Sequence, residues 1–177
     1  GAPQADNGSN SGHVRVYKWN GNAWTQLGQD IDGSGTEMSG WSISLNGDGT
    51  KLAVGVPYTQ QYGANTGEVR VYEYANNTWS QLGQDIIGEA QNDYSGYSVS
   101  LSSDGTIIAI SANLNGVDDA GHVRVYYWNG TVWTQRGQDI DGEAAGDQSG
   151  HSVSLSSDGT IVAIGAAENN GNGSQSG

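Results

Sequence analysis

The chain of 177 residues contains no cysteine, no phenylalanine and only two prolines. Without cysteine, neither a disulfide framework nor a thiolate site is available to it. No apolar run approaches the ~18 residues of a membrane-spanning helix, so membrane insertion is not expected. No segment shows a sustained helical period of apolar residues either, which argues against an α-helical protein.

Basic residues are scarce as well. Six lysines and arginines stand against 19 acidic residues, which gives a formal net charge of −13 at pH 7. Such a surface repels phosphate backbones and anionic membranes, so nucleic acid is not expected as a partner. Glycine is abundant, with 29 residues, and the chain has 6 tryptophans and 9 tyrosines. This composition is typical of short strands joined by tight turns.

The dominant feature of the sequence is a unit that occurs three times. Its opening segment reads GHVRVYKW, then GEVRVYEY and then GHVRVYYW, with steps of 55 residues from Gly12 to Gly67 and 54 from Gly67 to Gly121. A fixed period of this size predicts a repeat architecture, in which each unit buries its apolar faces against its neighbours. We expect a single repeat array over residues 1–177, composed of the units 12–66, 67–120 and 121–177 after the end of a preceding repeat at 1–11.

Each unit carries four strand signals, described here for the first unit. Residues 14–19 are rich in β-branched and aromatic side chains and end at Asn20-Gly21, a strong hairpin signal. Further strands are expected at 24–31, 41–45 and 51–56. Four antiparallel strands in about 55 residues match one blade of a β-propeller. The predicted fold class is therefore all-β, a repeat protein of four-stranded antiparallel propeller-type blades.

In propeller order the array contains two whole blades plus two half-blades. The whole blades span about residues 41–86 and 97–140, and the half-blades span about 13–31 and 151–167. Known rings use roughly 4–8 blades, so this array does not close by itself. Two alternatives follow: the chain is an excerpt of a longer propeller, or the trailing half of one subunit completes the leading half of the next. Such head-to-tail contact forms either a ring or a filament.

Several motifs recur in an order known from other propellers. The fourth strands end in small residues (AVGVP from Ala53, AISA from Ala109 and AIGA from Ala163), and a Ser-Gly pair precedes the third strand of each unit. With the Asp-Gly turn between these two strands, the chain resembles FG-GAP repeats, the blades of integrin-α-like propellers. The resemblance implies an extracellular or cell-surface location and a role in cell adhesion.

The chain departs from this family at its calcium loops. Many FG-GAP blades carry a loop of the type Asp-x-Asp/Asn-x-Asp-Gly, whereas the turns here read NGDG at 46–49 and SSDG at 102–105 and 156–159. Calcium takes 6–8 oxygen ligands, so one carboxylate in each turn is too few for a tight site. No cofactor is expected beyond weakly bound Ca²⁺.

Charged residues recur at matching positions of the units. The arginines Arg15, Arg70 and Arg124 share one position, and we expect them to form structural ion pairs with Asp30, Asp85 and Asp139 on the neighbouring strand. The alternative is that they anchor a ligand. Acidic pairs two residues apart share one strand face and are weak metal candidates, with a solvated acidic loop as the alternative; these pairs are Asp30 with Asp32 and Asp139 with Asp141.

Modification and ligand stacking are further possibilities. Four Asn-x-Ser/Thr sequons are candidates for glycosylation, namely Asn7, Asn76, Asn129 and Asn172. The six tryptophans are expected to pack between sheets, with glycan stacking as the alternative. His13, His122 and His151 show no metal-ligand spacing, and no Gly-x-Ser-x-Gly elbow is present, so the sequence predicts no enzyme.

The sequence leads to one functional hypothesis and one alternative. The first is a non-enzymatic extracellular structural repeat protein. It would self-assemble head to tail through half-blade complementation, with a fibril, a surface appendage or a multi-subunit propeller as the product. The alternative is an adhesin or lectin-like propeller that binds glycan or a surface protein through its loops.

Overall fold

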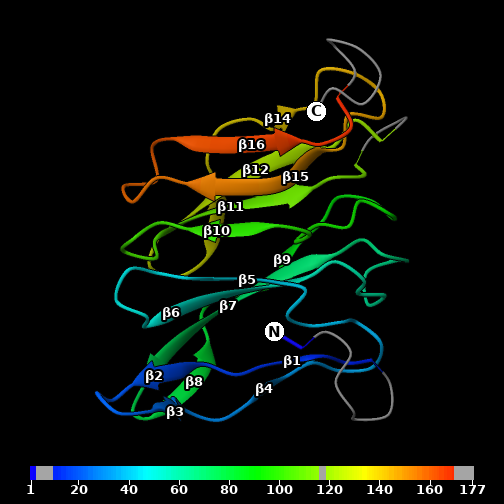
Figure 1. Ribbon diagram of the computed structural model, residues 1–177. Coiled ribbons are helices and arrows are strands. Elements are labelled where there is room, and N and C mark those ends of the chain that lie inside the picture. Colours follow the sequence, from blue (N-terminus) through cyan, green and yellow to red (C-terminus); the bar gives the residue numbers. More distant parts are fainter. Residues whose placement is uncertain (3–9, 116–118, 170–177) are drawn as a thin grey trace.

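The computed structural model describes residues 1–2, 10–115 and 119–169. These residues form 16 β-strands and no helix, which confirms the all-β prediction. The sheets lie side by side in the order of the sequence, as the colours from blue to red show (Figure 1). This arrangement is that of a β-propeller-like fold. Among the described residues no helix is long and apolar enough to cross a membrane.

The strands are short. They are β1 (His13–Val14), β2 (Tyr17–Trp19), β3 (Trp24–Gln26), β4 (Ile31–Asp32), β5 (Ser42–Leu45), β6 (Lys51–Val56), β7 (Glu68–Ala75), β8 (Thr78–Gln81), β9 (Ile86–Ile87), β10 (Val99–Leu101), β11 (Ile107–Ala112), β12 (His122–Trp128), β13 (Trp133–Gln135), β14 (Ile140–Asp141), β15 (Ser149–Leu155) and β16 (Val162–Ala166).

The strands form two five-stranded sheets and three two-stranded ones. The first large sheet has the order β5-β6-β7-β8 and the second the order β10-β11-β12-β13, with β9 paired to β7 and β14 to β12. The pairs β1–β4 and β2–β3 form the leading end of the array, and β15–β16 forms its trailing end. All of these pairings are antiparallel. The register repeats as well, because Val54 opposes Arg70 just as Ile110 opposes Arg124.

The large sheets have five strands where the sequence predicts four. The expected second strand of each unit is split, so that residues 24–31 contain β3 and β4 separately. The break falls at Gly28, Gly83 and Gly137, which have φ of 78°, 79° and 82°. A positive φ is incompatible with an extended strand and is readily adopted only by glycine. A backbone kink at a glycine, which the pattern of apolar residues does not reveal, therefore separates the two strands.

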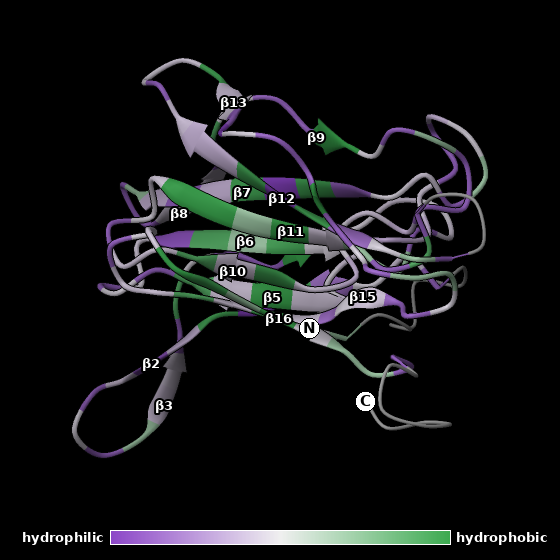
Figure 2. Cartoon of the chain, turned by 90° about the horizontal axis from the view of Figure 1, so that it is seen from above, coloured by the Kyte–Doolittle hydropathy of each residue, from purple (hydrophilic) through white to green (hydrophobic). Residues whose placement is uncertain are grey.

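Two hydrophobic clusters fill the spaces between successive sheets, and the hydrophobic colour marks the central strands β6 and β11 (Figure 2). The cluster beside the leading end consists of Val14, Val16, Ile31, Leu52, Val54, Val56 and Trp79. The cluster between the two large sheets consists of Ala53, Val69, Val71, Ile86, Val99, Leu101, Ile108, Ile110 and Trp133. Both clusters combine side chains of two units, so a single unit does not bury its own core.

A glutamine of each of the first two units holds the tryptophan of the unit that follows. Gln29 accepts a hydrogen bond from the backbone N of Trp79 (3.0 Å) and donates to its carbonyl (2.7 Å), while Trp79 Nε1 donates to the Leu27 carbonyl (2.8 Å). Gln84 forms the same two bonds with Trp133, at 3.2 and 2.9 Å. The indoles are only 3% and 4% exposed. Each clamp fixes both the position and the tilt of the next hairpin.

The first strands of successive sheets also touch. The Leu101 amide donates to Ser44 Oγ and the Leu155 amide donates to Ser100 Oγ, both at 3.0 Å. Sheets of a propeller approach each other most closely around the axis, so β5, β10 and β15 are its inner strands. Short turns lie on one side of the array and longer loops on the other, the right-hand side of the view (Figure 1).

The tryptophan contacts yield a stability prediction. Trp133→Ala removes a buried indole and should lower the free energy of unfolding by about 3–5 kcal/mol, measured by urea denaturation. Trp24→Ala is the matched control, because Trp24 occupies the same position of the first unit but is 66% exposed. In dilute solution Trp24→Ala should change the free energy of unfolding by no more than about 0.5 kcal/mol. Equal losses for the two variants would contradict this account of the core.

Candidate functional site

An aromatic row lies at the inner edge of the fold, where the long loops enter the first strands. Trp41, Tyr97 and His151 occupy one position in three successive units, and their ring centroids are 5.8 and 5.6 Å apart. Tyr58 lies 5.0 Å from Trp41, and Tyr94 lies 5.4 Å from Tyr58. His151 is exposed and Trp41 is 37% exposed. The row therefore presents aromatic faces and an imidazole to solvent.

A glycine turn places each member of this row. The residue immediately before it is Gly40, Gly96 or Gly150, with φ of 86°, 87° and 93°. A Cβ on Gly96 would lie 2.6 Å from the carbonyl oxygen of Glu68, so no larger residue fits. The Ser-Gly pairs seen in the sequence are thus the hinges at which the loop turns into the inner strand.

The predicted arginine–aspartate partners lie within ion-pair distance in all three units, and in two of them they are hydrogen-bonded. Arg15 Nη2 lies 2.7 Å from Asp30, and Arg124 Nη2 donates to Asp139 at 2.8 Å. In the middle unit Arg70 Nε lies 3.9 Å from Asp85, outside hydrogen-bond distance. The arginine turns there toward other carboxylates.

Sequence reasoning missed these other carboxylates. Arg70 donates to both Glu37 oxygens at 2.8 and 3.1 Å and also pairs with Glu68. Arg124 pairs with Glu89. Glu37 and Glu89 come from the loop of the preceding unit, so each of these arginines joins two units electrostatically. Aligning the acidic loops against the arginine of the following unit would have indicated the contact.

Glu68 is the most perturbed acid of this network. Its side chain is fully buried, and burial raises the pKa of its carboxyl to about 7, against an opposing effect of Arg70. Burial also lowers the pKa of His122, the residue at the same position of the third unit, and Arg124 adds to that shift. For Asp30, by contrast, the hydrogen bond from Arg15 lowers the pKa to about 2. The repeat position of Glu68 and His122 thus holds an acid in the second unit and a base in the third.

The acidic pairs Asp30 with Asp32 and Asp139 with Asp141 stay a prediction as weak metal ligands. Asp30 is bound by Arg15, whereas Asp32 is exposed and pairs through its backbone with His13. Asp141 pairs in the same way with His122.

Asp139 instead joins a different group that could hold a metal. Ligand atoms of Glu89, His122 and Asp139 all lie within 4.8 Å of one another. Arg124 Nη2 contacts both carboxylates of this group, so a guanidinium already supplies the compensating charge. A cation would have to compete with it.

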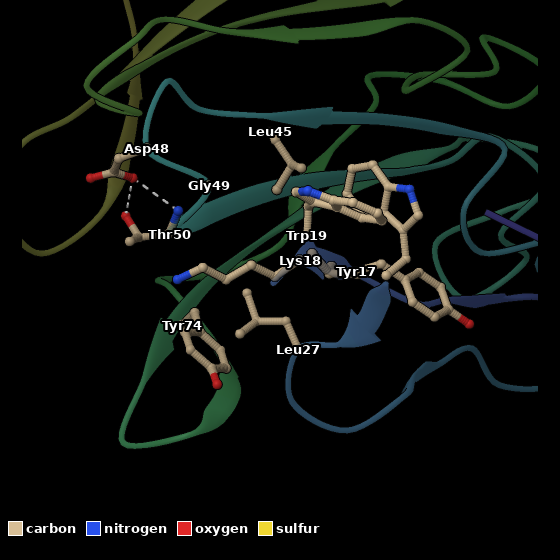
Figure 3. Close-up of a pocket in the computed structure, with 11 residues that line it drawn as sticks. Tyr17, Lys18, Trp19, Leu27, Leu45, Asp48, Gly49, Thr50 and Tyr74 are labelled. Atoms are coloured by element: carbon tan, nitrogen blue, oxygen red, sulfur yellow. Dashed lines mark hydrogen bonds between the residues drawn. The ribbon is translucent and has the colours of Figure 1, made fainter. Parts of the chain in front are cut away.

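A pocket of about 480 Å³ opens at the leading end of the array, beside β2 (Figure 3). Its lining is largely apolar and includes Trp19, Trp24, Leu45 and Tyr74. The neighbouring turn is rigid, because Asp48 accepts hydrogen bonds from the backbone N and the hydroxyl of Thr50, at 2.9 and 2.6 Å. Such a lining suits an apolar protein segment better than a polar metabolite.

The sequons fall in two groups. Asn7 and Asn172 lie outside the described residues. Asn76 sits in the β7–β8 turn with φ of 52° and is exposed. Asn129 is exposed in the β12–β13 turn, and its Nδ2 donates to Thr134 Oγ1 at 3.2 Å. Glycosylation at these sites stays a prediction.

No family model and no curated protein matches the sequence. Solved structures do match. A proposed 6-phosphogluconolactonase from Bacteroides uniformis has a TM-score of 0.63 at 11% identity, over 91% of this chain and 43% of that one. A second proposed 6-phosphogluconolactonase, from Bacteroides fragilis, has a TM-score of 0.61 at 18% identity, over 89% of this chain and 42% of that one. The periplasmic gluconolactonase PpgL of Pseudomonas aeruginosa has a TM-score of 0.53 at 17% identity, over 88% of this chain and 44% of that one.

The chain thus spans less than half the length of these proteins. At such identities the likeness shows a shared fold. It nevertheless corrects the resemblance to FG-GAP integrin-type repeats, because the similar structures are lactonase-like and no family model supports that family. Small strand ends, Asp-Gly turns and Ser-Gly hinges are packing requirements of stacked sheets, so unrelated propellers share them.

The same finding overturns the functional hypotheses drawn from the sequence. A non-enzymatic structural protein that forms fibrils and an adhesin or lectin-like module are both wrong, because the similar structures are named as enzymes. The prediction that the chain is no enzyme fails with them. That prediction relied on the absence of a contiguous catalytic motif, which a site assembled from several units would not display.

Glu68 yields a pH prediction. Its folded pKa of about 7 lies above the ordinary 4.5, so the folded state holds this proton more tightly than the unfolded chain. Stability from this group is therefore fully present below about pH 4.5 and is lost as the pH rises through 7. Between about pH 5 and about pH 8, wild type should lose up to about 3 kcal/mol relative to Glu68→Gln.

The comparison with Glu68→Gln is needed because burial lowers the pKa of His122, which makes stability rise with pH and so opposes the effect of Glu68. Denaturation midpoints of both proteins across this range provide the measurement. Parallel stability curves for the two proteins would contradict the assignment.

Proposed function

We propose that this chain forms part of a lactonase, a hydrolase that opens a cyclic sugar ester, and that its substrate binds along the aromatic row. The observation that carries the proposal is the alignment of Trp41, Tyr97 and His151 at one inner position of three successive units. Ligands of open-ended sheet folds bind where loops of several units converge. The likeness to a periplasmic gluconolactonase and two proposed 6-phosphogluconolactonases supports this reaction class.

The blade count belongs to the same proposal. We interpret residues 41–86 and 97–140 as two whole blades, and 13–31 and 151–167 as half-blades of a larger propeller. Each large sheet then counts as one blade, with its outermost strand broken by the glycine kink. In this frame the aromatic row lines the loop side of the central axis.

The row offers the chemistry that lactone hydrolysis requires. Aromatic faces such as Trp41 and Tyr97 can cover the C–H face of a sugar ring and fix its orientation. The imidazole of His151 can take a proton from a water molecule, whose oxygen then attacks the ester carbonyl. Cleavage of the ring C–O bond and return of that proton to the ring oxygen give a hydroxy acid. One water is consumed and no other reactant is needed.

Charge favours an unphosphorylated substrate. Recognition of a phosphate group usually depends on an available guanidinium. Arg15, Arg70 and Arg124 are each bound to carboxylates, and the net charge is −13. The remaining arginine, Arg136, lines cavities beside Val125 and Tyr127 and not the aromatic row. We therefore propose that a neutral aldonolactone is a better substrate than its phosphate ester.

Location and metal binding stay secondary parts of the proposal. A site of action outside the cytoplasm fits the cysteine-free chain and the periplasmic protein of Pseudomonas aeruginosa. A divalent cation at Glu89, His122 and Asp139 would bind only weakly, since Arg124 must first withdraw.

Two variants test the site. His151→Ala should lower kcat for glucono-δ-lactone roughly 100-fold, because it removes the general base. Trp41→Ala should mainly raise KM, about tenfold, through loss of stacking. Acid release above the spontaneous rate, followed with a pH indicator, provides the measurement. The 6-phospho ester should be the poorer substrate.

Trp19→Ala is the matched control, since Trp19 is 50% exposed but lies away from the row. It should leave both kinetic constants unchanged. The proposal fails if neither lactone is hydrolysed faster than in buffer, or if His151→Ala retains full activity.

A further inference from the structure

Two of the hairpin turns that repeat along the array contain an Asn-Gly pair. Asn20-Gly21 joins β2 to β3 and Asn129-Gly130 joins β12 to β13, whereas the matching turn between β7 and β8 contains Asn76-Asn77. All of these residues are exposed. Their exposure is not an effect of the ends of the array, because the sheet that carries the β7–β8 turn has a neighbouring sheet on both sides (Figure 1).

The side-chain carbonyl of each of these asparagines is held by two backbone amides. Asn20 Oδ1 accepts hydrogen bonds from the N–H groups of Asn22 and Ala23, both at 2.9 Å. Asn129 Oδ1 accepts the same two bonds from the second and third residues that follow it, at 2.9 and 3.0 Å. Such bonds fold the side chain back over its own turn and polarise its carbonyl group.

The glycine nitrogen of each turn is available as a nucleophile. Among the residues that the structure describes, neither the Gly21 N–H nor the Gly130 N–H donates a hydrogen bond. A Cβ at either glycine would meet no atom within 4 Å, so water and hydroxide can reach both amides. Glycine also lacks a side chain that would hinder the approach of its nitrogen to the neighbouring carbonyl carbon.

An Asn-Gly pair in the β5–β6 turn provides the contrast. Asn46 is only 7% exposed, and its Oδ1 accepts a hydrogen bond from the Lys51 amide at 2.8 Å. The Gly47 N–H donates to the carbonyl of Ser103 in the next sheet, also at 2.8 Å. In this turn the nucleophile is engaged and the asparagine is covered, although the local sequence is the same.

We propose that Asn20 and Asn129 are sites of spontaneous deamidation in the folded protein, with two backbone amides acting as an oxyanion hole. The glycine nitrogen loses its proton to water or hydroxide and bonds to Cγ of the asparagine. The negative charge that develops on Oδ1 lies where both N–H groups already point. The Cγ–Nδ2 bond then breaks, and the nitrogen takes up a proton and leaves as ammonia. Water opens the resulting succinimide to aspartate or isoaspartate, so water is the only other reactant.

The reaction changes both charge and backbone of these turns. Aspartate adds a negative charge to a chain whose net charge is already −13, whereas isoaspartate inserts an extra CH₂ group into the main chain. Conversion of Asn129 also removes the acceptor of the sequon Asn129-Gly130-Thr131. Deamidation and glycosylation of that turn therefore exclude each other.

Incubation of the folded protein at mildly alkaline pH, followed by proteolysis and mass spectrometry, measures the conversion of each asparagine. Asn20 and Asn129 should convert at least about tenfold faster than Asn46. Asn76 is the matched internal control, because it is also exposed in a hairpin turn but is followed by asparagine instead of glycine. Its conversion should likewise be at least about tenfold slower.

The same measurement in guanidinium chloride separates the effect of the fold from that of the sequence. In the unfolded chain Asn20, Asn46 and Asn129 should react at similar rates. Folding should slow Asn46 and leave the other two at least as fast as before. The proposal is overturned if Asn20 and Asn129 react more slowly in the folded protein than in the unfolded chain, or no faster than Asn46 in the folded protein.

Discussion

The insertion of one unit's tryptophan into the preceding unit is the contact on which the structure depends. Trp79 and Trp133 lie at the centres of the two hydrophobic clusters and are the residues that the glutamines clamp. Burial of an indole supplies stabilisation, while the three hydrogen bonds fix its direction. The relative placement of the sheets follows from this pair of effects. The inner strands are brought together as a consequence, and with them the aromatic row.

The ion pairs, like the tryptophan contacts, join neighbouring units. The chain carries −13, yet its buried arginines are each surrounded by carboxylates of two units. Removing charges from water is costly unless they are paired, so these contacts favour one arrangement of neighbours over others. Glu68 is the exception, because burial raises the pKa of its carboxyl to about 7 and leaves it about half protonated at pH 7. Arg70 thus contacts both Glu37, whose pKa is lowered, and Glu68, whose pKa is raised.

The candidate site is a product of repetition and variation together. The Ser-Gly hinge repeats in each unit and presents the next side chain at the inner edge. That side chain differs between units: Trp41, Tyr97 and His151. A constant scaffold with a variable inner residue can join stacking surfaces to a proton acceptor. This is a means of building a reactive site without any contiguous catalytic motif.

The sequence by itself determined the all-β class, the unit length and most strand positions, because period-2 apolar patterns and Asn-Gly or Asp-Gly turns are local properties. It also indicated the Arg15–Asp30 and Arg124–Asp139 neighbours, which lie within one unit. Only the tertiary structure decided which units meet. Arg70 with Glu37 and the row ending in His151 join residues more than 30 positions apart. Their proximity depends on the tilt between sheets, which buried indoles set and no local pattern encodes.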